Sequence, residues 1–180
     1  MNKSGVARFA IHYMLERKNF TGGAIFGTLK NLIYFRQMIE EIRKKIVKCL
    51  DLDSGDMRSQ LKNSQNESFI DFMIEFFNSK DVQDKVKKKK HMNIDRVHNK
   101  FLLCLDGAED LINHNQSEFN EFLHRLLNEC ANLSIIITTS CSVNMLVSEH
   151  GFAPRIILLK PLKQEESVEQ FLSIANDVTA

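Results

Sequence analysis

The sequence lacks the features that mark a secreted or membrane-spanning protein. No apolar run approaches the roughly 20 residues that a membrane-spanning helix needs, and the first residues lack the apolar core of a signal peptide. No two cysteines stand at C-x-x-C spacing, which favours reduced thiols over disulfides or a zinc site. The four are Cys49, Cys104, Cys130 and Cys141. We therefore expect a cytoplasmic protein that makes no contact with a membrane.

Net charge is also small, but it is unevenly distributed. The chain has 180 residues, enough for one domain with a real core, and a formal net charge of +1. Residues 1–50 carry ten Lys or Arg against three Asp or Glu (+7), whereas residues 101–180 carry four against eleven (−7). This asymmetry fits a phosphate site shared between the two halves, and it fits equally a fold that pairs its own halves.

One stretch organises the chain: residues 101–106, in which five apolar residues lead into Asp106. Polar residues do not alternate with apolar ones, so the stretch is typical of a strand covered on both faces in a parallel sheet. Open α/β sheets bind ligands at the carboxyl ends of their strands. Asp106 is therefore a candidate ligand for a metal ion held near phosphates, with Glu109 close behind it. The alternative is that Asp106 only caps the next turn.

Strands and helices alternate along the whole chain. We expect strands over residues 24–29, 101–106, 133–137 and 155–159, the third followed by Thr138, Thr139 and Ser140. We expect helices over residues 6–17, 31–50 and 67–78, one capped by Ser117, a short one to about residue 150, and one over 165–176. This order predicts an α/β fold, a parallel sheet flanked by helices.

Helical spacing also predicts which side chains face the core. The first helix is expected to have one apolar face, formed by residues that recur at spacings of three and four: Val6, Phe9, Ala10, Tyr13 and Met14. The second helix has a longer stripe that includes Ile39, Ile42 and Ile46.

A basic loop is expected over residues 80–100, with eight Lys or Arg against three Asp. We interpret it as solvated rather than as a nucleic-acid site, because no aromatic residue interleaves the lysines.

Lys3 and Ser4 open the first helix, and Lys-Ser in that place ends the phosphate-binding loop G-x-x-x-x-G-K-[ST]. In that loop, helix-start amides surround the phosphates, the lysine neutralises them and the hydroxyl holds magnesium. Only the last two letters are present. The alternative is a surface lysine beside a capping serine.

Five segments in order resemble the nucleotide-binding domain of the NB-ARC class of STAND-type P-loop NTPases, relatives of plant resistance proteins and apoptotic-protease-activating factors. They are the Walker A tail KSGVA (3–7), the second strand FTGGAIF (20–26), the Walker B segment LLCLDGAEDL (102–111), the sensor strand LSIIITTS (133–140), and ILLKPL (157–162) with Glu166-Ser167 and Phe171-Leu172 behind it.

The resemblance implies a fold and a set of site residues. The fold is a P-loop NTPase-like sheet, and the ligand is ADP or ATP with Mg²⁺. In that family the implied roles are phosphate binding by Lys3 with Gly5 beside it, magnesium binding by Ser4 and Asp106, polarisation of water by Glu109, and sensing of the terminal phosphate by Thr138 and Thr139.

Two departures bear on activity. Relatives often have an acid where this chain has Gly107, and many have an Arg where it has Ser140. The departures weaken any expectation of hydrolysis. The resemblance implies an ADP/ATP-dependent oligomerisation switch that is at most a slow ATPase, with nucleotide and protein partners or self-association.

The resemblance also implies that the first, central strand is missing. In the family that strand precedes the phosphate loop and lies between the sensor strand and the last strand. We thus expect residues 1–180 to form a single partial domain, truncated within the Walker A motif, with weakened nucleotide affinity. The alternative is a non-catalytic interaction module that binds partners through the exposed sheet edge or the basic run from Lys85 to Lys90.

Overall fold

The computed structural model describes residues 3–50, 66–78, 100–141 and 155–160, with residues 163, 165, 166 and 168. The elements in order are α1 (Lys3–Glu16), β1 (Gly23–Thr28), α2 (Phe35–Leu50), α4 (Asn66–Asn78), β2 (Phe101–Asp106), α6 (Glu109–Glu129) and β3 (Leu133–Thr138). Apart from Asn66 and Lys100, the expected loops over 51–66 and 80–100 lie outside the described residues, as does the short helix before residue 150.

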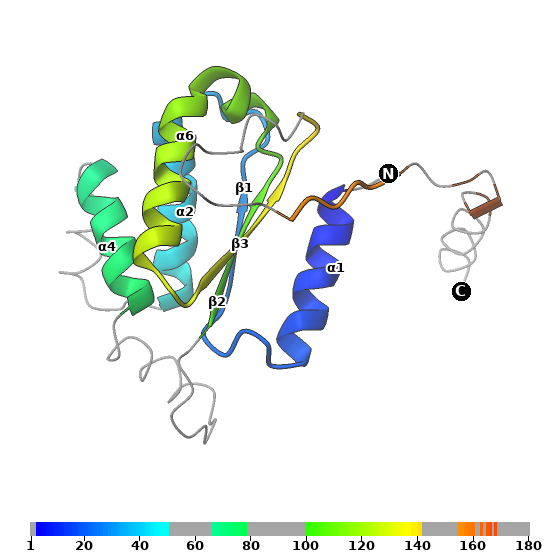
Figure 1. Cartoon of the computed structure of the whole chain (residues 1–180), viewed down its shortest axis with the longest axis horizontal. Helices are drawn as coiled ribbons and strands as arrows, with labels where there is room; N and C mark the ends of the chain where they lie inside the picture. Colours follow the sequence, from blue (N-terminus) through cyan, green and yellow to red (C-terminus); the bar gives the residue numbers. More distant parts are fainter. Residues whose placement is uncertain are drawn as a thin grey trace.

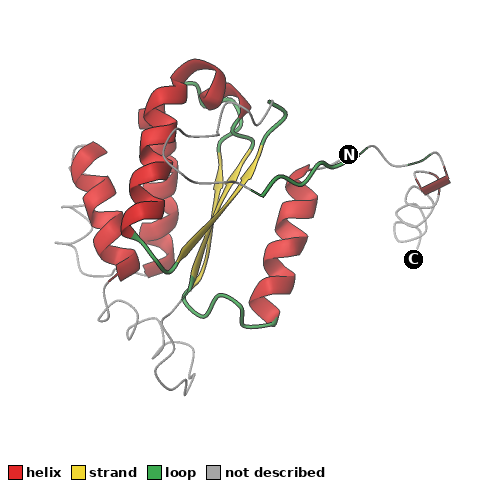
Figure 2. Ribbon diagram, in the orientation of Figure 1, coloured by secondary structure: helices red, strands yellow, loops and turns green. Residues whose placement is uncertain are grey.

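The described strands form one parallel sheet in the order β1-β2-β3. Their register is flush: Gly23 pairs with Phe101 and Phe101 with Leu133, and the same holds at the other end for Thr28, Asp106 and Thr138. Helix α1 covers one face of the sheet, whereas α2, α4 and α6 cover the other (Figure 1). The layers are helix, sheet and helices (Figure 2), so the expected α/β fold with a flanked parallel sheet is confirmed.

β2 is buried along its whole length. None of its six residues is more than 3% exposed. Its side chains alternate between two cores: Phe101, Leu103 and Leu105 pack with α2, α4 and α6, whereas Leu102 and Cys104 pack with α1. Coverage of both faces explains why the sequence has no polar alternation here.

The larger core lies between the sheet and the three helices. Ile39, Ile42 and Ile46 of α2 are completely buried there, so the expected stripe of this helix is confirmed. Phenylalanine rings of α4 pack against the first residue of β2, where the ring centroids of Phe76 and Phe101 lie 5.7 Å apart. Such aromatic contacts add to the stability that burial provides.

Only part of the expected apolar face of α1 packs on the sheet: Met14 contacts the smaller core, but most of that face does not. Ala7 and Ile11 face the sheet, with 6% and 7% of their surface exposed, whereas Val6, Phe9 and Tyr13 are 41%, 75% and 46% exposed. Because α1 carries apolar residues on both sides, helical spacing alone does not select the side that packs.

Two expected helix starts are also wrong. Helix α6 begins at Glu109, eight residues before Ser117, but it is divided by a kink at Asn115, whose φ is −136° and ψ is 43°. Its second part therefore begins within two residues of the expected cap, and only the first part was not expected. Helix α2 begins at Phe35 rather than at residue 31, because Asn31 has a φ of +63°, which a right-handed helix does not accommodate.

The expected strand over residues 155–159 is not formed. Residues 155–160 have no regular structure, and Ile157 and Leu158 are 73% and 82% exposed. A strand exists only when a neighbour pairs with it, and no described strand pairs with this segment.

The cysteines provide a test of this packing. Burial, with a contribution from the nearby Asp106 carboxylate, raises the pKa of Cys104 to about 12. Burial, with a contribution from Glu129, raises the pKa of Cys130 to about 11. Cys141 is only half-buried.

We expect a Cys49→Ser variant of the folded chain to expose one reactive thiol, Cys141, to an aromatic disulfide reagent at pH 8. Buried thiols of raised pKa supply almost no thiolate. In denaturant, Cys104 and Cys130 should react as well. Mass spectrometry of the labelled peptides would identify the sites, and rapid native labelling of Cys104 would contradict the burial of β2.

Candidate functional site

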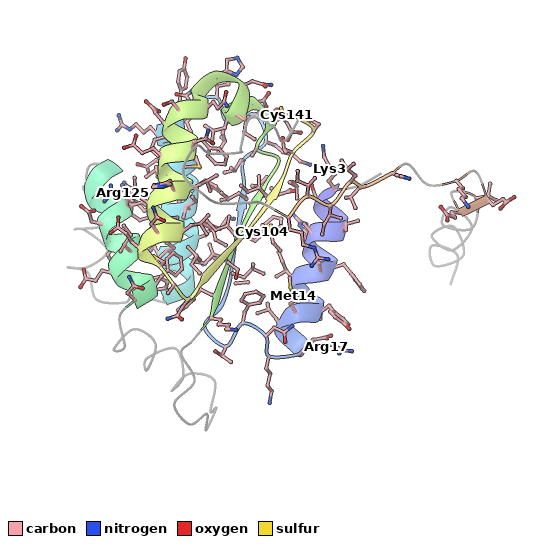
Figure 3. The ribbon with its side chains drawn as sticks, in the orientation of Figure 1. Lys3, Met14, Arg17, Cys104, Arg125 and Cys141 are labelled. Carbon is pink, nitrogen blue, oxygen red and sulfur yellow. The ribbon has the colours of Figure 1, made fainter. Side chains whose placement is uncertain are left out.

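The flush register brings the carboxyl ends of the three strands to one rim of the sheet. Thr28, Asp106 and Thr138 lie side by side there, one from each strand. The start of α6 follows directly, and the start of α1 lies at the same end of the molecule, where Figure 3 labels Lys3 and Cys141. Polar residues that are distant in the sequence are thus gathered at one place.

Asp106 and Thr138 form the centre of the rim. Asp106 is 1% exposed, and the hydroxyl of Thr138 donates a hydrogen bond of 2.6 Å to its Oδ1 atom. The Thr138 hydroxyl in turn accepts from the amide of Gly107 at 2.8 Å. The Thr138 carbonyl accepts from the amides of Gly107 and Ala108 at 3.1 and 3.0 Å. These bonds fix the orientation of a buried carboxylate, because the hydroxyl that donates to Asp106 is itself held by the Gly107 amide.

Gly107 makes the turn that follows Asp106. Its φ is +78°, and a Cβ atom there would lie 2.5 Å from Cγ of Lys30. The loop after β1 is held against this turn by the amide of Leu29, which donates to the carbonyl of Asp106 at 2.7 Å. A side chain at position 107 would therefore meet both backbone strain and a packed neighbour.

Lys3 reaches this rim from the other face of the sheet. Its Nζ lies 3.9 Å from Oε1 of Glu109, and the two side chains are 33% and 28% exposed. The second oxygen of Glu109, Oε2, is buried and has no hydrogen-bond partner among the described residues. A buried unpaired carboxylate oxygen is costly, so this atom is suited to accept a hydrogen bond from a ligand or to contact a cation.

The remaining residues expected at the site are nearby without a direct bond to Asp106. Ser4 and Gly5 are half-buried in the first turn of α1 beside Lys3. Thr139 accepts from the amide of Cys141 at 3.0 Å, so it shapes the turn after β3. Among the described residues, neither Ser4 nor Thr139 hydrogen-bonds to Asp106.

The rim also contains contacts that the sequence did not predict. The Asp110 carboxylate accepts from the amide of Asn31 at 3.2 Å, and the Asn115 side chain donates to the carbonyl of Ile33 at 2.6 Å. Cys141 Sγ lies 3.4 Å from Oδ1 of Asn113. The first two bonds tie α6 to the loop after β1 across 79 and 82 residues, and the third ties α6 to the turn after β3. No sequence pattern predicts contacts so distant in the chain.

A hollow of about 550 Å³ lies beside the end of β1. Its lining includes Thr28 but neither Asp106 nor Glu109, and it is formed mainly by Tyr34 and the first turns of α2. The hollow is therefore separate from the acidic group of the rim.

The described residues contain no cluster of three or more His, Cys, Asp or Glu side chains that could hold a metal ion. Magnesium, however, commonly binds through one or two carboxylates together with phosphate oxygens and water. Asp106 and Glu109 provide such a partial donor set, so they fit Mg²⁺ that arrives with a phosphate ligand.

No family model, no curated protein and no solved structure matches this chain. Among the described residues, no helix has both the length and the apolar character needed to cross a membrane.

We expect Thr138→Val to lower the free energy of unfolding by about 1–3 kcal/mol, because it leaves the buried Asp106 carboxylate and the Gly107 amide without their hydroxyl partner. Thr138→Ser keeps the hydroxyl and is the control. Urea unfolding followed by circular dichroism measures both. Equal stability of the Val and Ser variants would contradict the role assigned to this hydroxyl.

Gly107→Ala should destabilise the chain by about 1–3 kcal/mol, through its positive φ and the contact with Lys30. The matched control is Gly27→Ala in β1, where a Cβ atom would have only ordinary contacts at 3.8 Å. We expect the control to stay within about 1 kcal/mol of the parent chain in the same assay. Similar losses in both variants would count against the constraint at Gly107.

Proposed function

We propose that this chain binds ADP or ATP with Mg²⁺ at the rim of its sheet and acts as an NB-ARC-type switch domain of P-loop NTPase-like fold. One observation carries the proposal: the hydrogen bond between Thr138 and Asp106 orients a buried carboxylate at the end of a central strand, while Lys3 reaches the adjacent Glu109. A cation and two carboxylates at one rim suit a magnesium-bound phosphate.

Each residue has a defined role in this proposal. Asp106 holds the magnesium, directly or through water, together with the Ser4 hydroxyl. Lys3 contacts the outer phosphates with Gly5 in the same turn. Thr138 and Thr139 respond to the terminal phosphate. Because Lys3 now faces Glu109, a bound phosphate competes with Glu109 for the ammonium group, and the free carboxylate becomes available to polarise a water molecule.

Slow or absent hydrolysis is part of the proposal. Gly107 has a positive φ and lies against Lys30, so an acidic side chain is not accommodated where relatives often carry one. Ser140 supplies no positive charge to stabilise a transition state. Both features favour a chain that holds nucleotide rather than one that turns it over.

A second function is supported by a different observation. β3 pairs on one side only among the described residues, although its residues 135–137 are all isoleucine. An apolar edge strand is a surface to which another strand adds. The chain would then be an interaction module that does not need nucleotide.

Isothermal titration of the whole chain with ADP and with ATP, each with and without Mg²⁺, tests the first function. We expect Lys3→Ala to weaken binding by about tenfold or more, because a charge-assisted bond to phosphate is lost. Asp106→Asn should remove the dependence on Mg²⁺. Lys100→Ala is the control, since this exposed lysine lies at the opposite end of β2.

Equal, weak heats from the parent chain and from Lys3→Ala would remove the nucleotide function. Equal losses in Lys3→Ala and Lys100→Ala would indicate unspecific attraction of phosphate to positive charge rather than a site.

A further inference from the structure

The turn that follows β1 is fixed beside the end of β2. The register puts Thr28 level with Asp106, and the Leu29 amide continues the pairing with a hydrogen bond of 2.7 Å to the Asp106 carbonyl. Leu29 is completely buried, and its carbonyl accepts from the Leu32 amide at 3.0 Å, which closes a four-residue turn. Lys30 is the second residue of this turn, so the register that places Thr28 also places the backbone of Lys30.

Asn31, the third residue of the turn, is held from the side of α6. Its φ is +63°, a conformation that Asn tolerates in turns. Its amide donates a hydrogen bond of 3.2 Å to Oδ2 of Asp110, which lies in the first turn of α6. The turn is therefore bonded to β2 through Leu29 and to α6 through Asn31, and Lys30 lies between these two attachments.

The side chain of Lys30 lies across Gly107, the residue that follows Asp106. A Cβ atom at Gly107 would lie 2.5 Å from Cγ of Lys30 and 3.4 Å from its Cε atom. The aliphatic stem thus occupies the space that a side chain at position 107 would need, and the ammonium group is one bond beyond Cε. Because this position is glycine, a second lysine reaches the turn between Asp106 and Glu109.

The charge of Lys30 is available to a ligand. The side chain is exposed and forms no ion pair with another residue of the described part of the chain. Lys3, by contrast, comes from α1 and lies 3.9 Å from Oε1 of Glu109. The rim therefore has two ammonium groups, from two different elements, beside carboxylates that suit magnesium. This arrangement suits a ligand whose negative charge is spread over several phosphate oxygens.

We propose that Lys30 is a second phosphate-binding residue of the rim, and that the ligand class of this site is a magnesium-bound chain of two or three linked phosphates. Lys3 and Lys30 contact the phosphate oxygens, while Asp106 holds the magnesium. The inference rests on the phosphate site of the function proposed above, but it does not depend on the nucleoside. It also accounts for the glycine after Asp106, since a side chain there would displace the stem of Lys30.

The test is isothermal titration of the whole chain with inorganic tripolyphosphate premixed with Mg²⁺. Lys30→Met keeps an unbranched stem over Gly107 and removes the charge, so it should raise the dissociation constant by about tenfold. Lys30→Arg keeps the charge and should stay within about threefold of the parent chain. Lys18→Met is the matched control, because Lys18 is also an exposed turn lysine and follows the end of α1 opposite to Lys3.

A second measurement uses the parent chain alone, so it does not depend on how well a variant folds. An acylating reagent modifies exposed lysines, and tripolyphosphate with Mg²⁺ should slow the modification of Lys3 and Lys30 several-fold. Modification of Lys18 should proceed at the same rate with and without the ligand. Mass spectrometry of the peptides measures the three rates.

Three results would overturn the inference: no binding of tripolyphosphate by the parent chain, unchanged binding by Lys30→Met, or no protection of Lys30. The charge of Lys30 would then only balance the carboxylates of the rim. Equal losses in Lys30→Met and Lys18→Met would also overturn it, because they would indicate unspecific attraction.

Failure of this inference can be told apart from failure of the nucleotide function. A parent chain that binds tripolyphosphate through Lys30 but binds neither ADP nor ATP would remove the nucleotide function and leave the inference standing. Nucleotide binding that depends on Lys3 but not on Lys30 would leave the nucleotide function and remove the inference.

Discussion

The structure depends on the burial of β2 on both faces and along both edges. Its backbone groups pair with β1 and β3, and its side chains fill two separate cores. A slip of one residue would exchange the two sets of side chains, sending Leu102 and Cys104 into the three-helix core and Leu103 toward α1. The flush register is therefore strongly determined. That register alone brings Asp106 level with Thr138, which is the first condition for any chemistry at the rim.

The burial and parallel pairing of β2 could be predicted from the sequence, because the residues that cause them are close together in the chain. An uninterrupted apolar run that ends in an aspartate has few stable placements other than a covered parallel strand. The stripe of α2 was equally predictable, since its other side is densely charged and only one face could pack. Once these elements are parallel, the meeting of Asp106 and Thr138 follows from topology.

The remaining features could not be predicted because their causes lie far away in the chain. Helix α1 has apolar residues on two sides. Ala7 and Ile11 pack against the sheet, whereas Val6 and Phe9 are exposed. The kink of α6 lies at Asn115, whose side chain donates a hydrogen bond to the carbonyl of Ile33, 82 residues away in the sequence. Residues 155–160 have a strand's composition but no neighbour. Composition describes what a segment prefers, whereas the partner decides whether the preference is realised.

The rim and the β3 edge share a residue, and this residue links the two proposed functions. Thr138 is both the last residue of the edge strand and the partner of the Asp106 carboxylate. A strand added to β3 would restrict the backbone that positions the Thr138 hydroxyl, and a ligand at Asp106 would restrict the same residue from the other side. If the chain has both proposed functions, each event would reduce the ordering cost of the other, and by linkage the coupling would act equally in both directions. Strand addition to β3 and ligand binding at Asp106 would then both order the end of the same strand.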